Sequence, residues 1–118
     1  MSIASNLAGK AINISKTTAP HATSYPFTSL FNINHGHAVS LFFEKFFQFN
    51  YENKVKSETS FYLKKRFYLI FNLFNVQGIN DFNSKISLIK KQAKLEDNFQ
   101  TLNINIKQSS DEIIKGIN

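Results

Sequence analysis

The sequence contains no cysteine, which excludes disulfides and thiolate metal ligands. It also has little to interrupt regular structure, with 2 prolines and 4 glycines among 118 residues. No apolar run approaches the roughly 20 residues that a membrane-spanning helix needs. The first residues lack the basic segment and apolar core of a secretory signal peptide. These absences predict a cytoplasmic chain that does not enter a membrane.

Nucleotide-binding signatures are missing as well. The chain has no glycine-rich phosphate loop and no alternation of strands and helices, so no site for a nicotinamide dinucleotide can be placed in it. A chain of 118 residues is one domain at most. This length can bury a core but is small for an enzyme that depends on a nucleotide cofactor.

Apolar residues recur at spacings of three and four, which predicts helices along nearly the whole chain. We expect a loop over residues 50–57 and a kink at Pro26. The expected helices cover about residues 3–14, 19–31, 35–49, 58–76 and 82–93, and another follows Ser109. The sequence therefore predicts an all-α fold, a helical bundle.

Three local patterns predict the boundaries and connections of the elements in the C-terminal half. Gly78 follows the fourth apolar stretch, at the usual place for a helix C-cap. Ser109 and Glu112 have the spacing of a capping box at the start of the last helix. Residues 102–106 alternate in polarity and could form a strand, but no partner strand is evident, so an extended link is the other interpretation.

The chain has three histidines, and His21 and His35 lie fourteen positions apart. On one straight helix they would be roughly 21 Å apart, at about 1.5 Å per residue. They can meet only if the chain reverses between them. The residues Asn32 to Asn34, just before Gly36, tolerate turn conformations. The spacing therefore suggests a helical hairpin with one histidine on each arm.

The run from Ala8 to Val39, which contains Pro20-His21-Ala22 and Asn34-His35-Gly36-His37-Ala38, resembles the metal-binding segment of the iron-containing (group III) alcohol dehydrogenases. It is similar to a branch that includes phosphonate-aldehyde and sugar-acid dehydrogenases. The resemblance extends over about thirty residues in type, spacing and context. After Phe49 only the helical pattern agrees. Proline is common in the family where this chain has Asn34.

The resemblance implies that His21 and His35 are two ligands of Fe²⁺ or Zn²⁺ in an enzyme that transfers hydride between NAD(P) and a small alcohol or aldehyde. In the family, an Asp and a third His, four residues apart on a preceding helix, complete the ligand set. This chain has no Asp before Asp81 and no His before His21. We therefore expect residues 1–118 to be a partial helical metal-binding domain without its dinucleotide-binding domain, inactive unless the missing half is supplied.

Two further residues near the pair are candidates for supporting roles. Tyr25 lies one helical turn after His21, where several family members carry a histidine that relays a proton. The resemblance makes Tyr25 a candidate catalytic residue, and the other interpretation is an amphipathic residue at a domain interface. His37 would point about 200° away from His35 on a helix, which indicates a supporting or structural residue rather than a ligand.

The net charge of +6 keeps a nucleic-acid-binding domain among the alternatives. Its best local support is Lys64-Lys65-Arg66, which lies among Phe61, Tyr62, Phe67 and Tyr68. No nucleic-acid-binding motif accompanies this cluster, so we favour core aromatics beside solvated lysines, and we interpret Lys85, Lys90, Lys91 and Lys94 in the same way. A non-catalytic helical remnant or interaction module is the other alternative. Phenylalanine-rich faces also suggest a homo-oligomer.

Overall fold

The computed structural model describes residues 1–56 and 62–117, and in these ranges the chain is helical, without a strand. This confirms the predicted all-α class. The helices are α1 (Ser2–Ser15), α2 (Ala19–Phe31), α3 (His35–Glu52), α4 (Leu63–Phe74), α5 (Ile79–Gln92) and α6 (Ser110–Gly116). Within the described ranges, no helix combines the length and the apolar character that crossing a bilayer requires.

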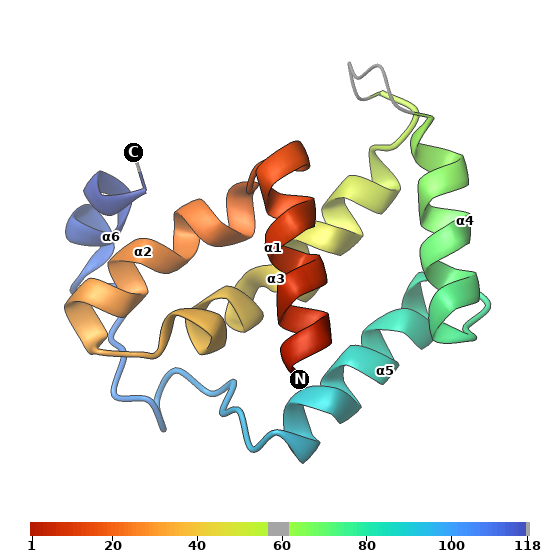
Figure 1. The fold of residues 1–118 in the computed structure, drawn as a ribbon. Helices are drawn as coiled ribbons and strands as arrows, with labels where there is room; N and C mark the ends of the chain where they lie inside the picture. Colours follow the sequence, from red (N-terminus) through yellow and green to blue (C-terminus); the bar gives the residue numbers. More distant parts are fainter. Residues whose placement is uncertain (57–61, 118) are drawn as a thin grey trace.

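The helices α2 and α3 form a hairpin and lie side by side (Figure 1). Pro20 occupies the first turn of α2, where its missing N–H costs nothing. Asn32 ends α2 in the left-handed conformation with φ of 54°, which asparagine tolerates. The predicted reversal before Gly36 is therefore confirmed, and it places the two histidine-bearing helices in contact.

Two apolar clusters stabilise the fold, and α3 contributes to both. The first cluster lies between α2, the N-terminal half of α3, the segment after α5, and α6. Its buried members are Phe27, Ile33, Ala38, Ile104 and Ile113. The second lies between the C-terminal half of α3, α4 and α5, and its buried members are Phe67, Phe71 and Phe82. Helix α3 therefore connects the two halves of the molecule.

Close packing of α6 on α2 closes the first cluster. A Cβ atom added at Gly116 would lie 2.8 Å from the Cβ of Pro26, which is nearer than real Cβ contacts. Glycine at this position therefore allows α6 to approach the buried Pro26 of α2. The sequence pattern alone did not indicate this steric requirement for glycine at position 116.

Several helix boundaries differ from the prediction. Helix α3 continues to Glu52, so residues 50–52 are helical rather than loop. Helix α4 begins at Leu63, and the predicted residues 57–61 lie outside the described ranges. Asn75 ends α4 with φ of 52°, and the N–H of Val76 then bonds back to the carbonyl of Phe71. Gly78 was predicted as this C-cap, which is wrong: it is the extended N-cap of α5.

The segment between α5 and α6 is irregular and forms turns, so the strand interpretation of residues 102–106 is wrong. Ile104 is buried in the first cluster, because the segment crosses the α2–α3 hairpin. Ser109 is the N-cap of α6 as predicted, but its side chain makes no capping hydrogen bond. The last helix therefore begins where the sequence indicates, without the reciprocal contacts of a capping box.

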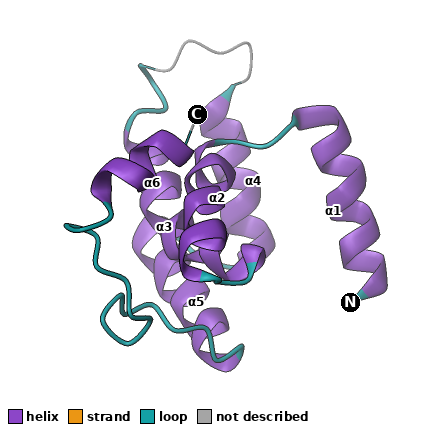
Figure 2. Cartoon of the chain, turned by 90° about the vertical axis from the view of Figure 1, so that its left-hand side faces the viewer, coloured by secondary structure: helices purple, strands orange, loops and turns teal. Residues whose placement is uncertain are grey.

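Helix α1 stands apart from the other helices (Figure 2). None of its residues is buried, and the predicted face of Ile3, Leu7, Ala11 and Ile14 is exposed. The helix itself was predicted correctly, but its apolar face has no core partner within residues 1–56 and 62–117.

Lys90 is the clearest departure from the expected solvated lysines, because only 5% of it is exposed. Its Nζ atom lies 2.8 Å from Glu44 Oε2 on α3 and 2.9 Å from Asp97 Oδ2 after α5. Burial lowers the pKa of Lys90, but hydrogen bonds and attraction to Glu44 and Asp97 outweigh this, so the pKa is raised above 10.5. Lys85, Lys91 and Lys94 are exposed as predicted.

Candidate metal centre

His21 on α2 and His35 on α3 lie next to each other. Their ring centroids are 5.1 Å apart and their planes meet at 62°. His21 is half-buried and His35, the first residue of α3, is exposed to solvent. The turn between the helices thus converts a separation of fourteen positions in sequence into a contact between two imidazoles.

Two residues of the next turn of α2 hold the ring of His35. Tyr25 stacks on it, with centroids 5.6 Å apart and an interplanar angle of 12°. Ser24, which is fully buried, places its Oγ 3.2 Å from His35 Nδ1 and donates a 2.7 Å hydrogen bond to the carbonyl of His21. Tyr25 was singled out from the sequence, whereas Ser24 was missed. Its position three residues after His21, on the same helical face, was the available signal.

His37 turns away from the pair. Its Nε2 lies 2.7 Å from the carbonyl oxygen of Glu96, which can only accept, so His37 donates this hydrogen bond. The contact ties the segment after α5 to the first turn of α3. This geometry agrees with the structural role expected for His37.

The donors present fit part of a metal site. Imidazole nitrogen is a common ligand of Fe²⁺ and Zn²⁺, and two imidazoles from facing helices are adjacent here. No group of three or more His, Cys, Asp or Glu residues lies close together within the described ranges. Because three protein ligands are usual at a catalytic site, further ligands would have to come from elsewhere.

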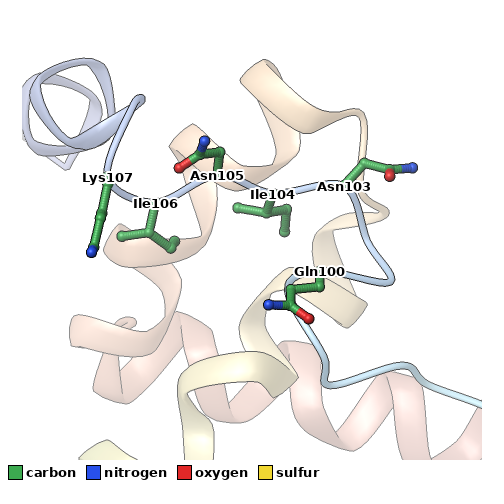
Figure 3. A pocket seen from close by; sticks show the side chains of 6 residues that line it. All are labelled: Gln100, Asn103, Ile104, Asn105, Ile106 and Lys107. Atoms are coloured by element: carbon green, nitrogen blue, oxygen red, sulfur yellow. The ribbon is translucent and has the colours of Figure 1, made fainter.

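A pocket of about 550 Å³ lies in the segment between α5 and α6, and no histidine is among its lining residues (Figure 3). Its lining comes entirely from this segment: Gln100, Asn103, Ile104, Asn105, Ile106 and Lys107. It offers amides, one lysine and apolar surface but no imidazole or carboxylate. We therefore place the candidate site at the histidine pair and not at this pocket.

The basic cluster on α4 is only partly as expected. Lys64, Lys65 and Arg66 are exposed and Phe67 is buried in the second cluster, as predicted. Tyr62 and Tyr68 are exposed, so the expectation that these two are core residues is wrong. Phe61 lies outside the described residues.

Comparison with known families identifies the family of the chain. The sequence matches the family model described as "Fe-containing alcohol dehydrogenase family, C-terminal" over residues 1–115. The chain belongs to this family. The match extends well beyond the thirty residues of the histidine segment and includes helices α4 to α6. No curated protein and no solved structure matches the chain significantly.

Membership of the Fe-containing alcohol dehydrogenases accounts for the all-α architecture and gives the adjacent imidazoles a chemical context. Intact enzymes of this family use a metal and NAD(P). The matched model describes the C-terminal part of the family. The match names neither ligands nor substrate.

Proposed function

We propose that this chain forms the metal-binding helical part of an NAD(P)-linked alcohol dehydrogenase, in which His21 and His35 are two of the ligands. The observation that carries the proposal is the contact of the two imidazoles across the α2–α3 hairpin, in a chain that belongs to the Fe-containing alcohol dehydrogenase family. A bound Fe²⁺ or Zn²⁺ would supply Lewis acidity to the oxygen of a small alcohol or aldehyde.

In this proposal the chain's own residues hold the metal and orient its ligands. His21 and His35 bind as neutral imidazoles from two helices that the hairpin fixes relative to each other. Tyr25 keeps the plane of His35 in place by stacking, and it remains the candidate catalytic residue beside the pair. Hydride transfer itself requires NAD(P), which would be bound by a missing half. The chain alone is therefore expected to be inactive.

Titration of the 118-residue chain with Fe²⁺ under anaerobic conditions, and with Zn²⁺, followed by calorimetry, tests the ligand assignment. We expect His21→Ala and His35→Ala each to weaken binding by more than about tenfold, a loss of about 1.4 kcal/mol or more. The matched control is His37→Gln, which also removes one imidazole but keeps an N–H that can reach the Glu96 carbonyl. It should bind like the parent.

Equal binding by the parent and both alanine variants would show that the ligand assignment is wrong. If the parent and all variants fail to bind either metal, a non-catalytic helical remnant or interaction module becomes the better interpretation. A steep fall of nucleic-acid affinity with salt would instead favour the basic-domain alternative, to which the exposed Tyr62 and Tyr68 add support.

A further inference from the structure

Ser24 connects the two candidate ligands through a single oxygen atom. It is 0% exposed, one helical turn after His21, with its side chain directed toward the start of α3. Its Oγ lies 2.7 Å from the backbone carbonyl of His21 and 3.2 Å from Nδ1 of His35. Because the Ser24 hydroxyl is buried, its two contacts restrict both the backbone of His21 and the ring of His35.

The proton arrangement in this contact follows from the inventory of donors. A serine hydroxyl has one hydrogen to donate, and a carbonyl oxygen can only accept. The shorter contact, to the carbonyl, therefore takes the hydroxyl hydrogen. The serine oxygen then faces His35 with a lone pair, and the contact is satisfied only if Nδ1 carries the proton. In a neutral imidazole this leaves the lone pair on Nε2.

Two ring contacts fix the direction in which that lone pair points. Tyr25 stacks on the face of His35 at an interplanar angle of 12°, and His21 meets the ring at 62°. The hydrogen bond from Nδ1 to buried Ser24 stops rotation within the ring plane. Metal-binding histidines generally donate their second N–H to a fixed acceptor, which sets tautomer and orientation. Ser24 is the acceptor in the position to do this for His35.

We propose that Ser24 is a positioning residue that holds His35 in the Nδ1–H tautomer and so keeps Nε2 free to bind a metal. The tautomer is a property of this chain alone, whereas its use in metal binding rests on the proposed function. The two parts can therefore be tested separately.

The first test uses the metal-free 118-residue chain. Long-range ¹H–¹⁵N correlation spectra, recorded at a pH at which the imidazoles are neutral, report which nitrogen of each histidine carries the proton. We expect His35 to be protonated at Nδ1 in the parent and to shift toward Nε2–H in Ser24→Ala. Ser29→Ala is the matched control, because Ser29 also bonds to a carbonyl three residues earlier on α2 but has no histidine partner.

An Nε2–H tautomer of His35 in the parent, or an unchanged tautomer in Ser24→Ala, overturns the proposal. Ser24→Cys keeps the size of the side chain with a weaker acceptor, so it guards against misfolding of the alanine variant. We expect it to give an intermediate tautomer ratio. A ratio identical to that of the parent would show that the hydroxyl does not set the tautomer.

The second test is metal affinity, followed by calorimetry with Zn²⁺. Loss of an outer partner of a ligand histidine typically weakens binding about 10- to 100-fold, and we expect this for Ser24→Ala but not for Ser29→Ala. If His21→Ala and His35→Ala lose binding while Ser24→Ala does not, the inference about Ser24 fails and the proposed function stands. If the tautomer depends on Ser24 but no histidine variant changes binding, the proposed function fails instead.

Discussion

The two halves of α3 are packed by different means. The N-terminal half meets α2 through two small buried side chains, Ala38 and Ser24, and through the edge-to-face pair of Phe27 and Phe42. The histidines of the two helices touch beside them. The C-terminal half meets α4 and α5 through stacked aromatics, among them Phe43, Phe47 and Phe82. The first half therefore combines an apolar cluster with the polar contacts of the candidate site, whereas the second half is packed mainly by phenylalanine rings that anchor the helix. One helix carries the candidate site at one end and its mechanical support at the other.

The largest effects should come from removing the buried phenylalanine at the centre of each half, Phe82 or Phe27. Phe82 is 1% exposed and its ring lies within 6.4 Å of those of Phe43, Phe47, Phe71 and Phe74. We expect Phe82→Ala to lower the free energy of unfolding by about 3–5 kcal/mol, because the cavity cannot be refilled without moving several rings. Denaturant unfolding followed by far-UV circular dichroism measures this.

Phe27→Ala makes the same change in the histidine-bearing half, and Leu73→Ala, at a side chain that is 81% exposed on α4, is the control. We expect Phe27→Ala to cost a similar amount to Phe82→Ala and Leu73→Ala to cost less than about 0.5 kcal/mol. A Phe82→Ala variant no less stable than Leu73→Ala would contradict the assignment of this side as the anchor.

A smaller effect is expected at the ion pair between the two halves. Lys90 on α5 reaches Glu44, near the middle of α3, and Asp97 in the segment that also covers the first cluster. Lys90→Met keeps much of the side-chain length but removes the charged partner of Glu44, which retains the hydrogen bond from the Ser87 hydroxyl. We expect a loss of about 1–3 kcal/mol in unfolding free energy, less than for a fully buried pair because Asp97 is half-exposed. Lys91→Met, at an exposed neighbour, should change little.

The same pair predicts a pH dependence. Because the pKa of Lys90 is raised in the folded chain, its stabilising contribution is present below the ordinary value of 10.5 and is lost as the pH rises through the folded pKa. The difference in unfolding free energy between the parent and Lys90→Met should therefore shrink above about pH 10.5. A difference that stays constant across this range would show that the charge of Lys90 does not matter.

The contrast between the two halves also explains what the sequence could predict. The aromatic stripe repeats at helical spacing, so α3, α4 and α5 and most of their core faces follow from periodicity. The contact of His21 with His35 depends on one residue, Asn32, in the left-handed conformation, and the asparagine-rich turn made this predictable. Ser24 and Lys90 were not predicted, because their partners come from other helices, and a polar residue looks the same in sequence whether solvated or buried and paired.

The smallest effect is expected for a substitution in helix α1. Its apolar residues recur as in a core helix, but none of its residues is buried, so it contrasts with both packed halves. Leu7 is 59% exposed, on a helix in which no residue is buried. We expect Leu7→Ser to change the unfolding free energy by less than about 0.5 kcal/mol, far below Phe27→Ala. Denaturant unfolding of both variants measures the ratio. A loss of more than about 1 kcal/mol in Leu7→Ser would mean that α1 packs against apolar surface in solution, and that the apolar periodicity of α1 reports a real contact, as it does for α4 and α5.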